Sequence, residues 1–177
     1  MAASDSEDRV DEVGARILEA ALDLLRAGGP RAVTMQAIAE TTGIAKTTIY
    51  RRHPNRRALL KAALESLAIR PSIQPDSSRD QRLKWVISQS VEVIADGIGV
   101  GGFAALLTNE DPEFSGAFRA ILGAHRAKAI EAHGSESGDG DTLIDMIVGG
   151  YVAEIARTGA IAPGWCERIA AVLDRRS

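Results

Sequence analysis

Residues 34–53, TMQAIAETTGIAKTTIYRRH, determine the expected fold of the N-terminal part of this chain. Thr34 offers a side-chain oxygen that can cap a helix running to about Thr42, and Gly43 is suited to the turn that ends it. A second short helix begins near Ala45. The side chains available to pack these helices together are apolar: Ile38, Ala39, Ile44 and Ile49. The stretch therefore predicts a helix-turn-helix.

The sequence on either side of this motif predicts two further helices. Before it, apolar residues recur at three- and four-residue steps until Gly28-Gly29-Pro30 must end the helix. After it, Pro54 disfavours helical geometry at His53 and separates the motif from a fourth helix. The apolar positions of the two flanking helices are Val13, Ile17, Ala20, Ala21, Leu24 and Leu25, and then Leu59, Leu60, Ala63, Leu64 and Leu67. The polar, acidic residues 1–10 are expected to form a disordered tail.

Charge is distributed unevenly along the chain. Residues 1–70 carry 11 basic and 9 acidic side chains, whereas the whole chain has a net charge of -3. No acid lies between Glu40 and Glu65, and the basic residues of this interval are Lys46, Arg51, Arg52, Arg56, Arg57 and Lys61. Such a cluster attracts phosphates, although charge alone equally fits a solvated basic face.

The remaining sequence predicts a helical body joined to the head by residues 70–78, which contain two prolines and three serines. Ser78 and Gln81 form a capping-box pattern that opens a helix to about Asp96, and the glycines of residues 97–102 are expected to break it. Asp111-Pro112 predicts the start of another helix. A flexible loop is expected over 134–140, followed by helices at about 141–158 and 163–175.

Composition places the chain among all-α globular proteins. Its hydrophobic fraction of 45% supports a buried core, and its aromatic fraction of 4% disfavours a sheet. Cys166 is alone, the N-terminus lacks the pattern of a secretory signal, and no uninterrupted run of eighteen apolar residues occurs. These features predict a cytoplasmic protein without membrane contact.

The sequence gives no indication of an enzyme. His53, His125 and His133 lack the spacing of metal ligands, and neither a phosphate-binding glycine loop nor a nucleophile elbow occurs. We therefore expect no metal and no cofactor.

The combination of motifs around the helix-turn-helix is more specific than the motif itself. Ile17-Leu18 and Ala20-Ala21 precede it, Tyr50 ends its second helix, and Arg56 is followed by Leu59-Leu60. In this pattern, roughly residues 12–72 resemble the TetR family of repressors. Two positions depart from the family: Ala45 stands where serine usually caps the second helix, and His53 where Phe or Trp is usual.

The resemblance implies an all-α protein with a three-helix DNA-binding head at residues 11–71 and a ligand-sensing, dimerising body at residues 76–177. It also implies a sequence-specific regulator, expected to be a repressor that binds double-stranded operator DNA as a homodimer. The implied DNA contacts are Thr34, Gln36, Lys46, Thr47, Thr48, Tyr50, Arg52 and Lys61, with Thr34, Arg52 and Lys61 at phosphates. For Tyr50, a mainly structural role with its hydroxyl at the surface is the alternative.

Two sets of residues in the body are expected to have separate functions. A pocket for a small, largely apolar effector would be lined by Trp85, Phe103, Phe114, Phe118 and His125, each of which could instead be plain core. The last two helices would form half of a four-helix dimer interface through Ile144, Ile147, Val148, Tyr151, Ile155, Trp165, Ile169 and Val172. An intrachain core is the alternative for this second set.

Two other functions fit the sequence less well. A helical enzyme would need a catalytic constellation that the chain lacks. A nonspecific architectural DNA binder would show little preference for one palindrome over competitor DNA.

Overall fold

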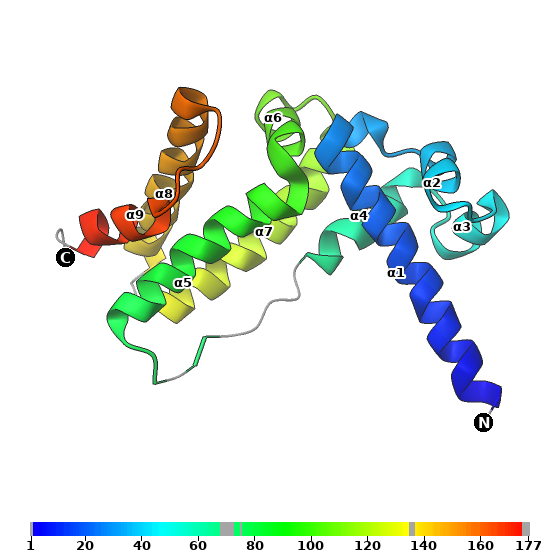
Figure 1. Ribbon diagram of the computed structural model, residues 1–177, viewed down its shortest axis with the longest axis horizontal. Helices are drawn as coiled ribbons and strands as arrows, with labels where there is room; N and C mark the ends of the chain where they lie inside the picture. Colours follow the sequence, from blue (N-terminus) through cyan, green and yellow to red (C-terminus); the bar gives the residue numbers. More distant parts are fainter. Residues whose placement is uncertain (1, 68–72, 75, 135–136, 175–177) are drawn as a thin grey trace. The chain divides into compact units, whose positions relative to one another are not determined.

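The computed structural model describes residues 2–67, 73–74, 76–134 and 137–174, and these residues form helices joined by turns and loops, without a strand. The all-α prediction is therefore confirmed. The elements are α1 (Ala2–Gly28), η1 (Pro30–Ala32), α2 (Met35–Thr42), α3 (Lys46–Arg52), α4 (Arg56–Ser66), α5 (Arg79–Glu92), η2 (Val93–Ile98), α6 (Gly99–Thr108), α7 (Pro112–His133), α8 (Ser137–Thr158) and α9 (Trp165–Asp174) (Figure 1).

The chain divides into two compact units, which are described separately below. The first unit comprises residues 1–69 and 95–121, and the second comprises residues 70–94 and 122–177. Residues 95–121 thus belong with the helix-turn-helix, whereas the sequence-based boundary at residues 71–76 assigns them to the body. Part of the expected joint, residues 70–72 and 75, lies outside the described residues.

Helix α1 is the central element of the first unit. It contacts α2, α4, α6 and η1, and its apolar stripe is buried at Ile17 and Leu25. The predicted stripe of α4 is likewise buried, from Leu59 to Leu67. Apolar burial of this kind supplies most of the stability of short helices, which are marginal alone.

The helix boundaries of the head follow from local capping chemistry. Thr34 Oγ1 accepts a hydrogen bond from the backbone N–H of Ala37 at 3.0 Å and begins α2. Gly43 ends α2 at φ 70°, in the left-handed region that favours glycine. The predicted bounds of α2 are confirmed. Asn55, which the sequence analysis did not single out as a cap, accepts from Ala58 N–H at 2.8 Å and begins α4.

The backbone of residues 2–10 continues α1, where the sequence predicts a disordered tail. Low hydrophobicity therefore does not prevent helix formation here.

The predicted break after Asp96 is present as the π-helical segment η2 and the left-handed Gly99, which separate α5 from α6. Arg26 of α1 donates from Nε to the carbonyl oxygens of Asp96, at 2.7 Å, and Gly97, at 3.2 Å. At Gly99, φ is +67°, and a Cβ would lie 3.2 Å from the Cα of Arg26. Gly99 therefore leaves right-handed helical geometry and also permits close approach to α1.

The helical stretch Arg79–Thr108 is long and apolar enough to cross a membrane by length and composition alone. The sequence has no uninterrupted run of eighteen apolar residues, and a span is therefore not expected from it. In the structure, 44% of the most apolar window of this stretch is buried inside the protein. One such helix is weak evidence of a membrane span.

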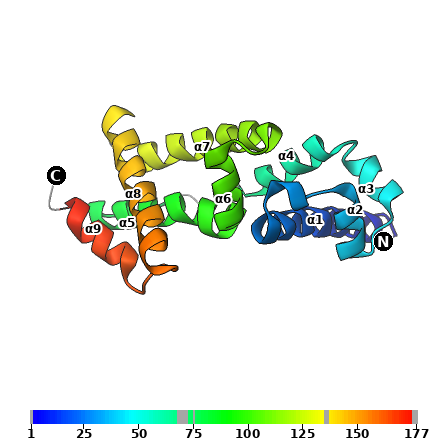
Figure 2. The same cartoon turned by 90° about the horizontal axis from the view of Figure 1, so that it is seen from above.

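In the second unit, α8 and α9 both contact α5, as Figure 2 shows. The predicted capping box of α5 is present, with Ser78 and Gln81 bonded reciprocally. Helix α8 begins at Ser137, within the loop expected over 134–140; residues 135–136 lie outside the described residues. Close packing explains the early start, since a Cβ on Gly140 would lie 2.7 Å from Cγ1 of Ile130.

Candidate nucleic-acid interface

Helix α3 presents one polar, solvent-exposed face. Ile49 is fully buried and holds the helix against the head, whereas Lys46, Thr47, Tyr50 and Arg51 are exposed. Positions one turn apart on a helix share a face, so these four side chains project together. Ala45 makes no side-chain cap, as its lack of a hydroxyl predicts. A short exposed helix with such a face matches the dimensions of a DNA major groove.

The other predicted DNA contacts differ in their surroundings. Thr34 and Gln36 are exposed at the start of α2, where Thr34 caps the helix and Gln36 donates a hydrogen bond to Glu40. Thr48 is half-buried. Lys61 is exposed on α4, at 3.6 Å from Glu65.

Arg52 lies against α1 and not in the open. An ideal Cβ on Gly14 would be 3.4 Å from Nη1 of Arg52, and the Nε of Arg52 is buried. Its exposed neighbour Arg51 shares the face of Lys46, Thr47 and Tyr50. Arg51 belongs to the basic cluster of the sequence but not to the expected DNA contacts, because the burial of Arg52 beside α1 cannot be inferred from the sequence.

Arg56 of α4 is bound inside the first unit. It donates to the carbonyl oxygens of Val33, at 2.8 Å, and Pro30, at 2.6 Å, and its Nη2 lies 2.5 Å from Asp111 Oδ2. Glu113 is a weaker partner at 3.6 Å. Arg56 therefore joins the start of α4 to the loop before α2 and to the start of α7.

Asp111 combines two interactions on one carboxylate. Its Oδ1 accepts from the backbone N–H of Phe114 at 3.0 Å, as the predicted cap requires, and its Oδ2 binds Arg56. Burial opposes ionisation of this group, but the hydrogen bonds from Arg56 and Phe114 and the charge of Arg56 outweigh it and hold the pKa below its ordinary value. Asp111 is therefore charged at neutral pH.

His53, at the end of α3, adds no positive charge to this region at neutral pH. Burial and the neighbouring charge of Arg52 lower the pKa of its imidazole. The cationic character of α3 therefore comes from its lysine and arginines.

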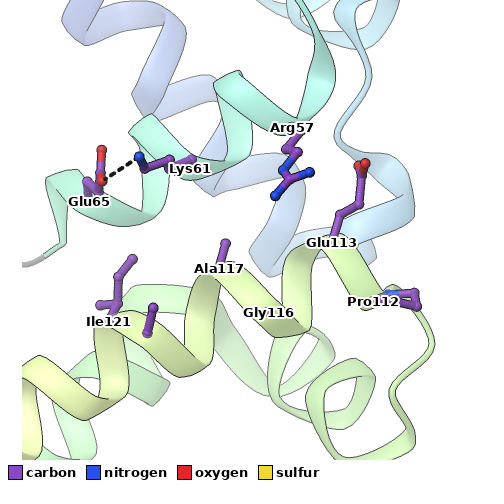
Figure 3. Close-up of a pocket in the computed structure, with 9 residues that line it drawn as sticks. Arg57, Lys61, Glu65, Pro112, Glu113, Gly116, Ala117 and Ile121 are labelled. Atoms are coloured by element: carbon purple, nitrogen blue, oxygen red, sulfur yellow. Dashed lines mark ion pairs between the residues drawn. The ribbon is translucent and has the colours of Figure 1, made fainter.

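A groove of about 480 Å³ lies between α4 and the beginning of α7 in the first unit (Figure 3). Arg57, Lys61 and Glu65 line it from α4, and Glu113 lies at the other wall. Its α7 side is formed by small and apolar residues: Pro112, Gly116, Ala117, Ala120 and Ile121. The groove contains none of the five residues expected to line an effector pocket.

Those five residues are divided between the units. Phe114 and Phe118 are fully buried core of the first unit, stacked with ring centroids 5.8 Å apart. Phe103, in the same unit, is half-buried. Trp85 and His125 belong to the second unit and are also half-buried.

The predicted dimer residues divide by exposure. Ile144, Ile147, Tyr151 and Trp165 are buried within the second unit, with Tyr151 and Trp165 in edge contact at 6.1 Å between centroids. These four form intrachain core, the alternative considered for them. Val148, Ile155 and Ile169 are half-buried, and Val172 is exposed.

Within the described ranges, no three His, Cys, Asp or Glu side chains are grouped to hold a metal ion.

Comparison with known proteins identifies a family match and a similar repressor. Residues 17–63 match the family model described as bacterial regulatory proteins, tetR family. Over 78 residues the chain is 37% identical to the HTH-type transcriptional repressor KstR of Rhodococcus jostii (strain RHA1). That alignment covers 42% of this chain and 37% of the repressor, so the likeness concerns little more than a third of the relative.

Proposed function

Since the chain belongs, through residues 17–63, to the TetR family of bacterial regulatory proteins, we propose that it is a cytoplasmic repressor that binds a palindromic operator as a homodimer and releases it when a small-molecule effector binds. The observation that supports this most directly is the exposed face of α3. Lys46, Thr47 and Tyr50 lie there on a helix that Ile49 anchors.

Sequence-specific binding is tested by selecting duplexes from a random pool with the purified protein. A recurrent palindrome whose half-sites are about one helical turn apart, or a multiple of it, is expected for a symmetric dimer. Specific affinity should exceed affinity for competitor DNA by about 10³-fold or more. If the protein retains duplexes from the pool without preferring any sequence, it is instead an architectural DNA binder.

The outward face of α8 supports the proposed dimer. An exposed stripe recurs at alternating steps of four and three residues and carries small or flexible side chains: Thr142, Met146, Gly149, Ala153 and Ala156. Alternating steps of three and four are the spacing of helices that pack along a shared seam. Val172 is an exposed apolar residue on α9. We propose that this outer stripe of α8, together with α9, forms the interface.

Ala153→Glu should convert the dimer to monomers, because it would bury a carboxylate at the centre of the stripe without a partner. Sedimentation velocity measures the change, and circular dichroism checks that helicity is retained. Ala127→Glu, at an exposed position of α7, is the matched control and should stay dimeric. A dimeric Ala153→Glu protein would move the interface away from α8.

An effector is proposed to act on α4, the helix that follows α3. The α4–α7 groove has an apolar floor that suits a small apolar molecule, and Arg56 and Asp111 join the same two helices. A ligand there would displace α4 and alter half-site spacing. Reciprocity gives the test: a ligand found by thermal-shift screening should bind about 5–150-fold more weakly in saturating operator. Equal affinity with and without operator would eliminate this mechanism.

A further inference from the structure

The four basic residues at the end of α3 and the start of α4 are Arg51, Arg52, Arg56 and Arg57. Arg52 lies against α1, and Arg56 is bound to two carbonyl oxygens and Asp111. Arg57 lines the α4–α7 groove. Arg51 is exposed, and no hydrogen bond or ion pair engages it within the described part of the chain.

The position of Arg51 directs it to the same surface as the residues on α3 expected to meet DNA. Arg51 follows Thr47 by one helical turn, and Tyr50 follows Lys46 by one helical turn, so the two pairs lie next to each other on α3. Threonine is short and neutral, lysine carries a point charge, and tyrosine has one hydroxyl. Arg51 has the one guanidinium fork on this face.

A guanidinium fork matches one base in particular. Guanine presents O6 and N7 in the major groove, and arginine donates to both at once. Lysine has the charge but lacks the planar fork, so it does not reproduce the pair of parallel hydrogen bonds. An arginine that also made internal hydrogen bonds, as Arg56 does, would have to break them first.

We propose that Arg51 is a specificity-determining residue that recognises a guanine in each half of the operator. The inference rests on the proposed function, because it requires a preferred operator. Arg52, in contrast, is half-buried and lies beside Gly14 of α1. Loss of Arg51 should therefore change which sequence is bound, in addition to how tightly DNA is bound.

The test uses the full chain and the operator obtained by selection. Each guanine of a half-site is replaced in turn by 7-deazaguanine, which removes N7 but keeps Watson–Crick pairing. Wild-type protein should lose affinity at one guanine by up to about 150-fold, the upper limit for a complete bidentate contact, because O6 still accepts the second hydrogen bond. Arg51→Ala should bind the unmodified operator more weakly and be insensitive to that replacement. Arg51→Lys should keep the salt dependence of the wild type but lose most of the guanine sensitivity.

Arg119→Ala, at an exposed position of α7 that does not line the α4–α7 groove, provides the charge-matched control, and it should retain full sensitivity to the replaced guanine. If Arg51→Ala keeps that sensitivity as well, the proposal is overturned. It is also overturned if Arg51→Ala weakens all duplexes equally and lowers the salt slope by about one, which is the result of a phosphate contact. A wild-type protein that selects no operator would instead contradict the proposed function.

Discussion

Residues of one type have different roles in this head because their surroundings differ. The sequence predicts a basic region between residues 46 and 61, but it does not distinguish Arg51 from Arg52. Their difference comes from Gly14 of α1, which lies 38 residues before Arg52 in the chain and packs beside its guanidinium group. In the same way, the sequence predicts Asp111 as a helix cap but gives no indication that Arg56 binds its second oxygen.

Asp111→Asn should lower the free energy of unfolding by about 1–3 kcal/mol, the cost of removing the partner of a charged hydrogen bond. Asparagine is as good a cap as aspartate, so this variant removes mainly the charge. Asp111→Ala should cost about 1 kcal/mol more, because the cap to Phe114 is lost as well. Urea unfolding followed by circular dichroism measures both differences.

The same pair predicts a pH dependence with a definite sign. Because the folded state lowers the pKa of Asp111, its stabilisation is complete above the unfolded-state pKa of about 4 and is lost as the pH falls through the folded-state value. The stability difference between wild type and Asp111→Asn should therefore be constant near pH 7 and shrink below about pH 4. A difference that grows on acidification would contradict the assigned charge state.

At the scale of the element, local chemistry made some boundaries predictable. Thr34, Gly43, the Ser78–Gln81 pair and Asp111 act on backbone groups within four residues, and the structure confirms all of them. The π-helical geometry of η2 and the start of α8 were not predicted, because both depend on distant contacts. Arg26 binds the carbonyl oxygens of η2, and Ile130 packs on Gly140.

Three glycines of these elements should respond differently to alanine. Gly43→Ala should destabilise by about 1–2 kcal/mol through its positive φ alone, since open space surrounds the new methyl group. Gly140→Ala should cost about 1–3 kcal/mol, because its Cβ would overlap Ile130. Gly123→Ala, in α7 with open space and no positive φ, should stabilise by about 0.5–1 kcal/mol. Thermal and urea unfolding of the three variants check these signs.

At the scale of the whole molecule, the first unit is discontinuous in sequence. Residues 95–121 complete this unit in two ways. Helix α6 packs on α1, and two carboxylates form ion pairs, Asp111 with Arg56 and Glu110 with Arg31. A sequence pattern locates a domain boundary from prolines and serines, and residues 70–78 have that composition. It cannot show that the chain later returns to the same unit, because that return depends on packing between segments far apart in sequence.

Residues 11–71 alone should therefore be less stable than the same residues in the full chain. A segment of about 60 residues is marginal even when its core is complete, and this one would lose the α6 cover of α1 and the carboxylate partner of Arg56. Hydrogen exchange of peptides from α1 and α4 should show protection lower by about 10-fold or more. A fusion that joins residues 1–69 to 95–121 through a flexible Gly/Ser linker supplies the control, and it should regain part of that protection. If the fragment of residues 11–71 shows the same hydrogen-exchange protection as the full chain, residues 95–121 contribute nothing to the stability of the head, and its boundary lies near residue 71. If both the fragment and the fusion lose protection, the head depends on the second unit also, and the two-unit division does not describe how this protein unfolds.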